Sequence, residues 1–243
     1  SQKELRTSLE KEKELSELKS RFVSMASHEF RTPLRTILSS ASLIGKYTEG
    51  TQQDRREKHI NRIKSMVNTL TGVLNDFLSL SKLEEGRIQV VPEHFQFNVF
   101  CKTVFEEVWP LLKGKQDLQH EALPEEVEVF HDKQLLRNIL YNLISNAIKY
   151  SPEESTIRCR TQIVKDNIQI EIQDQGMGIP EADQKHLFTR FFRASNAINI
   201  QGTGLGLNIV RSYVDLLKGE ISFNSVEGQG TTFYVLIPTQ YQA

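Results

Sequence analysis

The 243-residue sequence lacks several features that would mark other classes of protein. Its two cysteines, Cys101 and Cys159, lie far apart without CxxC spacing, which excludes a disulfide framework and indicates no zinc site. We therefore expect reduced thiols in a cytoplasmic protein. No apolar run approaches the ~18 residues that a membrane-spanning helix requires. The net charge of −1 supplies no broad basic surface, so we expect no nucleic-acid partner.

An initial methionine is also absent, and the first residues already follow a helical pattern. Residues 1–20 are rich in Glu, Lys and Leu, with apolar positions at Leu5, Leu9, Leu15 and Leu18. This pattern predicts a coiled-coil linker, whose seam changes phase between Leu9 and Leu15 because that step breaks the heptad. We expect a fragment of a longer protein, with an upstream sensor domain missing from it.

The next segment, residues 21–86, has the pattern of a helical hairpin. Apolar residues recur at three- and four-residue steps on both sides of a polar, glycine-containing stretch at 45–53. We predict a second helix at 54–83, ended by Gly86. Two such helices bury too little surface alone, whereas two copies would close a four-helix bundle, so we expect a homodimer formed through the hairpin.

After Gly86 the pattern becomes β-rich and aromatic, which places a domain boundary before residues 87–243. We predict strands at 87–91, 126–130, 156–164, 168–173, 220–224 and 231–237, and helices at 98–112, 133–150 and 205–217. Asn98 and Asp132 are the expected N-caps of the first two helices. Helices with mostly antiparallel strands indicate an α/β sandwich, so the whole chain is α+β.

The stretch FVSMASHEFRTPL at 22–34 contains the first candidate site. A neutral imidazole at His28 is a nitrogen nucleophile, and the adjacent carboxylate of Glu29 can accept its proton. Thr32 lies one turn further on the same helix face as His28. Pro33 lacks the N–H that would bond to the Glu29 carbonyl, so we expect the helix to bend or loosen there. A solvated His-Glu pair on a helix surface would have the same local sequence.

A second candidate site begins in the helix predicted at 133–150. Its polar residues recur at three- and four-residue steps, opposite an apolar stripe, and are Asn138, Asn142, Asn146, Lys149 and Tyr150. Carboxamide oxygens suit Mg²⁺, and a lysine suits phosphates. Solvent exposure would explain such a face equally well.

Three further stretches follow in the same domain. In DQGMGIP at 174–180, Asp174 can accept a hydrogen bond from an exocyclic amine, and Gly176 and Gly178 let the backbone approach a flat base. In LFTRFFR at 187–193, the arginines and the polar residues after them have the pattern of a mobile lid. In GTGLGL at 202–207, glycines open a helix whose amide groups suit phosphates. Each stretch alone also fits an ordinary turn or helix end.

Taken together, these stretches resemble the sensor histidine kinases of two-component systems. HEFRTPL resembles their phospho-acceptor box, and the four later stretches resemble, in order, the N, G1, F and G2 boxes of their ATP-binding domain, of the gyrase and chaperone type. The resemblance implies phosphorylation of His28 by ATP with Glu29 as general base. It also implies a response regulator receiver domain as partner, with Thr32 positioning water for phosphatase action. Such a kinase core is cytoplasmic, or the cytoplasmic part of a membrane-bound receptor.

The same resemblance implies roles in the nucleotide site. Asn146 would bind Mg²⁺, Tyr150 would lie near the nucleoside, and Asp174 would bind the adenine amine. Gly176 and Gly178 would shape the pocket. The residues implied near the phosphates or in the lid are Asn142, Lys149, Arg190, Arg193, Gly202, Thr203, Gly204, Leu205 and Gly206.

Two alternative functions stay open. An ATPase of the same fold would carry a water-activating glutamate four residues before the metal-binding Asn146, where this chain has Asn142, and a carboxamide is no general base. A silent scaffold or ATP-sensing module would be expected to lose His28, Asn146 or Asp174, and all three are present.

Overall fold

The computed structural model describes residues 2–243, apart from the side chains of residues 2–5, Lys11 and Leu15. The predicted seam residues Leu5 and Leu15 therefore lie outside the described side chains. The chain forms two compact units. The first comprises Ser1–Ser81 with Ile200–Gly204, and the second Lys82–Asn199 with Leu205–Ala243.

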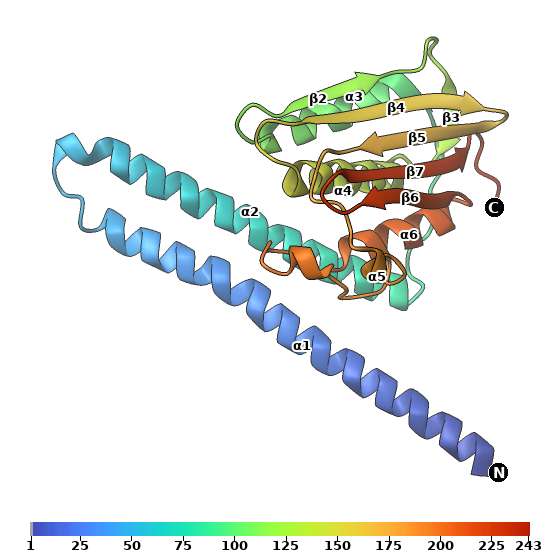
Figure 1. The fold of residues 1–243 in the computed structure, drawn as a ribbon, viewed down its shortest axis with the longest axis horizontal. Coiled ribbons are helices and arrows are strands. Elements are labelled where there is room, and N and C mark those ends of the chain that lie inside the picture. The colour runs from blue at the N-terminus through green and yellow to red at the C-terminus, as the bar shows by residue number, and fades with distance from the viewer. Residues whose placement is uncertain (1) are drawn as a thin grey trace. The chain divides into compact units, whose positions relative to one another are not determined.

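The first unit contains the predicted helical hairpin. Helix α1 (Gln2–Ile44) leads through a loop with the short helix η1 (Gly50–Gln52) into α2 (Gln53–Glu84), which runs back alongside it (Figure 1). Aromatic rings join the two helices: Phe77 of α2 lies 4.7 Å from Phe22 and 6.4 Å from Phe30, between ring centroids. The predicted apolar stripes therefore meet across the hairpin.

Helix α1 continues through Pro33 without a break. Hydroxyl groups bond to backbone carbonyls one turn earlier on both sides of the proline, as in Ser27 to Val23 at 2.8 Å and Thr36 to Thr32 at 3.1 Å. Pro33, where a bend or loosening is predicted, therefore does not interrupt the helix.

The second unit contains a five-stranded sheet in the order β2-β4-β5-β7-β6. Its strands are β2 (Asp117–Glu121), β4 (Thr156–Val164), β5 (Asn167–Gln173), β6 (Glu220–Val226) and β7 (Gly230–Pro238). Only the β2–β4 pair is parallel among these neighbours. Alternate residues of the central strand β5 are buried, as expected for a sheet with one covered face.

Helices cover that face (Figure 1). The three longer helices of this unit are α3 (Phe97–Val108), α4 (Lys133–Tyr150) and α6 (Gly206–Leu216). The unit also contains the short helices η2 (Trp109–Leu111), α5 (Glu181–Gln184) and η3 (Ser195–Ala197). In α4 the predicted apolar stripe is buried, including Ile139, Leu143 and Ile144. A small antiparallel sheet pairs β1 (Glu93–Gln96) with β3 (Glu128–His131). The α/β sandwich is confirmed.

The strand predicted at 87–91 is wrong. These residues have no strand partner, and β1 begins only at Glu93, after Pro92. The backbone N–H of Val91 instead donates to Asp132 Oδ2 at 2.9 Å. Asp132 is the N-cap of α4, as predicted, because its Oδ1 accepts the N–H of Leu135 at 2.9 Å.

The N-cap predicted at Asn98 is also wrong. Helix α3 begins at Phe97, and Glu126 Oε1 accepts the N–H groups of Asn98 and Val99 at 2.9 and 3.3 Å. The Asn98 carboxamide instead pairs with the backbone of Leu123. A carboxylate distant in sequence thus takes the capping role that a local asparagine was expected to have.

Candidate functional site

The His28 and Glu29 side chains lie together on α1 but in different environments. His28 Nδ1 is 3.3 Å from Glu29 Oε1, and the imidazole is 73% exposed whereas the carboxylate is 2% exposed. With its proton on Nδ1, the ring donates to Glu29 and presents the lone pair of Nε2 outward. Thr32 is exposed one turn further, with its hydroxyl 3.5 Å from the His28 carbonyl. This arrangement suits an imidazole nucleophile.

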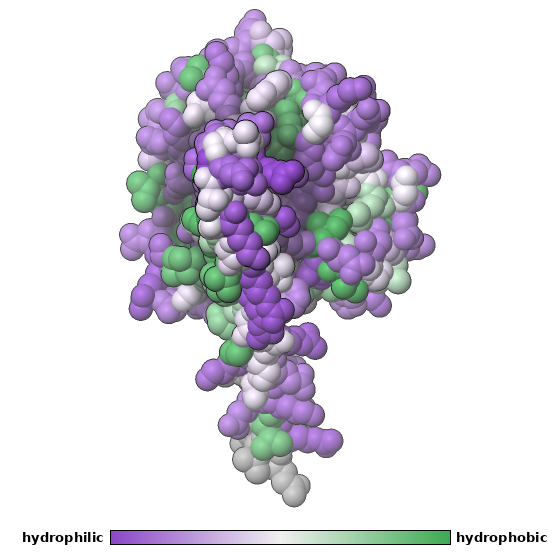
Figure 2. All heavy atoms as spheres, turned by 90° about the vertical axis from the view of Figure 1, so that its left-hand side faces the viewer, coloured by the Kyte–Doolittle hydropathy of each residue, from purple (hydrophilic) through white to green (hydrophobic). Residues whose placement is uncertain are grey.

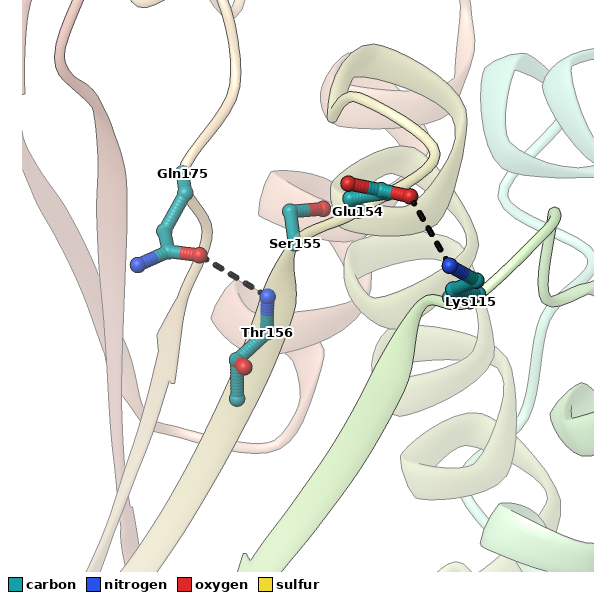
Figure 3. Close-up of a pocket in the computed structure, with 5 residues that line it drawn as sticks. All are labelled: Lys115, Glu154, Ser155, Thr156 and Gln175. Atoms are coloured by element: carbon teal, nitrogen blue, oxygen red, sulfur yellow. Dashed lines mark hydrogen bonds and ion pairs between the residues drawn. The ribbon is translucent and has the colours of Figure 1, made fainter.

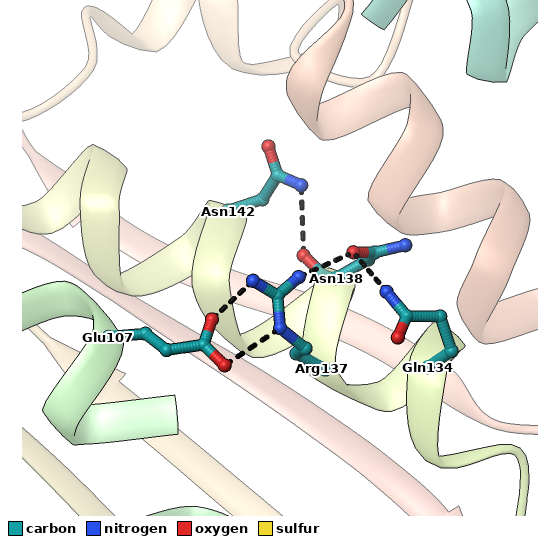
Figure 4. A network of polar contacts seen from close by, with 5 residues as sticks. All are labelled: Glu107, Gln134, Arg137, Asn138 and Asn142. Atoms are coloured by element: carbon teal, nitrogen blue, oxygen red, sulfur yellow. Dashed lines mark hydrogen bonds and ion pairs between the residues drawn. The ribbon is translucent and has the colours of Figure 1, made fainter. Parts of the chain in front are cut away.

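Two nucleotide stretches meet where α4 faces the start of α6. Asn142 Nδ2 donates to the Asn138 carbonyl at 2.8 Å, which fixes the carboxamide (Figure 4). A Cβ placed on Gly206 would lie 3.3 Å from Asn142 Oδ1. The fold therefore brings the first residue of α6 against the polar face of α4.

The spacing of Asn138 placed it among the candidate nucleotide residues, but its carboxamide bonds to other protein groups. Its Oδ1 accepts hydrogen bonds from Arg137 Nη1 at 3.3 Å and Gln134 Nε2 at 3.5 Å. Arg137 in turn pairs with both carboxylate oxygens of Glu107 on α3, with Nε to Oε1 at 3.0 Å (Figure 4). This carboxamide therefore belongs to a bridge between α3 and α4.

The C-terminal end of α4 holds the remaining predicted residues of that helix. Asn146 is half-buried, and none of the described residues hydrogen-bonds its carboxamide. Lys149 Nζ lies 5.0 Å from the ring centroid of Tyr150. The Tyr150 carbonyl accepts the Met177 N–H at 3.3 Å, which connects α4 to the turn after β5.

Asp174 directly follows β5, and one of its carboxylate oxygens accepts two hydrogen bonds. Its Oδ1 accepts the N–H of Gly176 at 2.8 Å and that of Thr231 at 3.1 Å. Burial raises the pKa of Asp174, while those two N–H groups act in the opposite direction. Among the described residues none donates to Oδ2, so this oxygen is available to an amine.

Gly176 and Gly178 were expected to let the backbone approach a base. The structure shows that each is needed for close packing of the backbone. A Cβ on Gly176 would lie 2.7 Å from the Tyr150 carbonyl oxygen, and one on Gly178 would lie 2.0 Å from that of Val226. Gly178 also has a left-handed backbone, with φ of 63°. Both glycines therefore allow one backbone segment to pack against another.

The predicted lid residues are engaged by protein groups. Arg190 pairs with Glu84, and Arg193 Nη2 donates to the carbonyls of Ala197 and Ile198 at 3.1 and 2.7 Å. The Thr203 hydroxyl is 2.7 Å from an Asp76 carboxylate oxygen within the first unit. The two predicted lid arginines and Thr203 thus all have partners in the chain.

Sequence reasoning missed two hydroxyl residues behind Asp174. Ser225 and Thr231 lie with their hydroxyl oxygens 2.8 Å apart, and Ser225 Oγ also accepts the Ile179 N–H at 2.9 Å. Their strands pair only in the folded sheet, so local spacing gave no signal for this contact.

A polar hollow lies beside the turn after β5 (Figure 3). It is lined by Lys115, Glu154, Ser155, Thr156 and Gln175. The Thr156 N–H donates to Gln175 Oε1 at 2.8 Å, and Lys115 pairs with Glu154 at 3.3 Å. None of the predicted nucleotide residues lines this hollow.

Comparison with known proteins assigns both parts of the chain. The family model for the His Kinase A (phospho-acceptor) domain matches residues 18–86. The one for the histidine kinase-, DNA gyrase B- and HSP90-like ATPases matches residues 131–241. Among curated proteins, the autoinducer 2 sensor kinase/phosphatase LuxQ of Vibrio parahaemolyticus is 34% identical over 90% of this chain. The chain spans 26% of the length of that relative.

Solved structures show the same architecture. The histidine kinase AdeS of Acinetobacter baumannii aligns with a TM-score of 0.65 and 25% identity, over 87% of this chain and 98% of that one. The histidine kinase ThkA, solved in complex with the response regulator protein TrrA, aligns with a TM-score of 0.63 and 21% identity, over 95% and 63%.

The helical hairpin with its histidine and the ATPase-type sandwich define the core of a histidine kinase. The chain belongs to the sensor histidine kinases. Within the described residues, no helix is long and apolar enough to cross a membrane.

Proposed function

We propose that this chain is a kinase core that phosphorylates itself on His28 with ATP. The pairing of an exposed imidazole with a buried carboxylate carries this proposal. Nε2 of His28 attacks the γ-phosphorus in line, an N–P bond forms, and the bond to the bridging oxygen breaks to release ADP. The Nδ1 proton passes to Glu29 as charge develops on the ring.

We place the nucleotide along α4 and the turn after β5. Asp174 Oδ2 would accept the adenine amine, with Tyr150 near the nucleoside and Lys149 near the phosphates. Asn146 would bind Mg²⁺, and its carboxamide fits because no described residue occupies it. Bound Mg²⁺ neutralises charge on the transferring phosphoryl group. Mg²⁺ commonly has few protein ligands and is bound largely through the substrate's phosphates, which suits a site with one carboxamide ligand.

Phosphate transfer tests this proposal directly. The protein is incubated with γ-labelled Mg²⁺-ATP, alongside His28→Gln and the control His59→Gln, whose histidine lies on α2 beside Ser40. We expect acid-labile, base-stable label on the wild type and on the control but none on His28→Gln. Equal labelling of His28→Gln would overturn the assignment of the acceptor.

The phosphoryl group would then pass to an aspartate of a response regulator, and Thr32 would serve the reverse, phosphatase reaction. Support comes from the exposed position of Thr32 beside His28 and from the kinase/phosphatase name of LuxQ. We expect Thr32→Ala to slow dephosphorylation of a receiver domain prephosphorylated with acetyl phosphate, and to leave labelling of His28 intact. Thr36→Ala, one turn further, is the matched control.

A second copy of the hairpin would cover the apolar residues that it exposes. Exposed examples are Leu34, Leu38, Val67, Leu74 and Leu78. Figure 2 shows apolar side chains, in green, exposed among hydrophilic ones on one face of the molecule. We therefore propose a homodimer through residues 21–86, with residues 1–20 as a coiled-coil linker and 87–243 as the catalytic domain. Sedimentation equilibrium should give twice the monomer mass.

A further inference from the structure

The loop between η2 and β2 closes the C-terminal end of helix α4. Lys113 Nζ donates to the carbonyls of Lys149 and Ser151, each at 3.0 Å. The last carbonyls of a helix have no intrahelical partner, and a cation there also opposes the negative end of the helix dipole. A lysine from outside the helix thus supplies part of its C-terminal cap.

Gln116 supplies the rest of this cap from the same loop. It is only 8% exposed, and its Nε2 lies 2.9 to 3.2 Å from the carbonyl oxygens of Ile148, Ser151 and Pro152. Its Oε1 accepts the N–H of Lys113 at 2.9 Å, so the two side chains hold each other in place. A buried amide with these partners is costly to remove, because the carbonyls would lose their donor.

The capped segment supports the turn that carries Asp174. The Tyr150 carbonyl lies between the capped carbonyls and accepts the Met177 N–H at 3.3 Å. Gly176 packs so closely on this carbonyl that a Cβ would approach it to 2.7 Å, and its N–H donates to Asp174 Oδ1. Gln116 therefore holds residues on either side of Tyr150, and the Tyr150 carbonyl in turn contacts the turn that carries Asp174.

We propose that Lys113 and Gln116 are positioning residues for recognition of the adenine base. They hold the end of α4 where its Tyr150 carbonyl sets the turn after β5, and so set the direction of Asp174 Oδ2. This inference rests on the proposed function, in which Asp174 binds the adenine amine. Neither residue is assigned to the phosphoryl transfer at His28.

The test compares ADP with inosine diphosphate, which carries an oxygen in place of the adenine amine. Variants Gln116→Leu and Lys113→Met keep side-chain volume and remove the donors. Lys115→Met is the matched control, because this lysine belongs to the same loop and its ammonium group pairs with the exposed Glu154. Dissociation constants are measured by calorimetric titration in the presence of Mg²⁺, well below the unfolding temperature of each variant.

We expect Gln116→Leu to weaken ADP binding about tenfold, the size seen when outer supporting partners are lost. Binding of inosine diphosphate should change little, so the preference for ADP falls. The KM for ATP should rise with little change in kcat. Lys113→Arg should retain the wild-type preference for ADP over inosine diphosphate. If Gln116→Leu does not fold, the same measurements are made on Lys113→Met.

Three results distinguish failure of this inference from failure of the proposed function. A wild type that binds no ADP contradicts the proposed function itself. A wild type that prefers ADP, with variants that keep the same preference, overturns the positioning role alone. Equal weakening of both nucleotides would indicate general loosening and would also overturn it.

Discussion

The His28 imidazole and the Glu29 carboxylate lie 3.3 Å apart on consecutive residues, yet one is exposed and the other buried. Consecutive helix residues point about 100° apart, so the carboxylate reaches the ring from the covered side of the helix. In the proposed reaction, a phosphate donor reaches Nε2 from solvent while the proton leaves through Nδ1 on the other side. This arrangement separates the path of the phosphoryl group from the path of the proton.

Replacing the buried carboxylate should slow the chemical step. Glu29→Gln keeps the shape of the side chain but accepts no proton, so we expect kcat for autophosphorylation to fall about 10²- to 10⁴-fold. The KM for ATP should stay unchanged, because Glu29 is not assigned to nucleotide binding. Glu57→Gln, at an exposed position of α2, is the control. A Glu29→Gln rate within twofold of the wild type would rule out the proton-transfer role.

Asp174 should make stability depend on pH in a defined direction. Burial raises its pKa in the folded chain. A carboxyl group with a raised folded pKa favours folding below its unfolded pKa, and this contribution is lost as pH rises through the folded value. Ionised Asp174 therefore costs stability near neutral pH, and Asp174→Asn avoids that cost.

The measurement is urea unfolding of the wild type and Asp174→Asn between about pH 7 and about pH 4. The stability of the variant relative to the wild type should decrease on acidification, because only the wild type gains a proton at this position. Asp117→Asn, at an exposed residue of β2, corrects for general effects of charge. If the relative stability of the two proteins does not change with pH, the pKa of Asp174 is not raised by folding.

Much of the fold could be predicted from the sequence because its signals are local. The apolar periodicity of α1, α2 and α4 depends on neighbours within one or two turns, and Asp132 caps α4 three residues away. The strands predicted at 156–164 and 168–173 likewise follow from local patterns, and they pair as β4 and β5 through a turn at Lys165, which has φ of 57°.

The errors came from partners distant in sequence. Glu126 caps α3 from a position 28 residues beyond Asn98, and local sequence gives no signal for such a partner. Residues 87–91 have a strand-like composition but no strand to pair with, whereas the charged segment Asp117–Glu121 was missed and pairs with β4 at the sheet edge. In the candidate site, the DQGMGIP motif singles out Asp174. Its donor Thr231, and Gln116, which donates to a carbonyl at the end of α4, reach these positions only by folding.

Asp132 should be a strong stability determinant of the second unit. Its two oxygens accept separate N–H groups, Leu135 at the start of α4 and Val91 in the segment that follows α2. Asp132→Ala removes both acceptors, and we expect a loss of about 2 kcal/mol in the free energy of unfolding. Asp132→Asn retains one acceptor oxygen and should lose about half as much. Denaturant unfolding measures both, and equal stability of all three proteins would refute the double role.

Gly178 and Gly228 both have left-handed backbone conformations. Substituting each by alanine distinguishes the effect of steric contact from the effect of backbone conformation on stability. Gly178 and Gly228 have φ of 63° and 79°, but a Cβ meets the Val226 carbonyl at 2.0 Å in the first case and nothing within 4 Å in the second. Gly228→Ala should therefore cost about 1 kcal/mol, the expense of a left-handed alanine.

Gly178→Ala must in addition push β6 away from the turn that carries Asp174. We expect a loss of stability several-fold greater than that of Gly228→Ala, together with weaker ADP binding even at temperatures where the variant is folded. Thermal unfolding and calorimetric titration of the two variants provide the comparison. If both alanines cost the same, backbone conformation alone would explain Gly178, and its close packing on the Val226 carbonyl would have no energetic role.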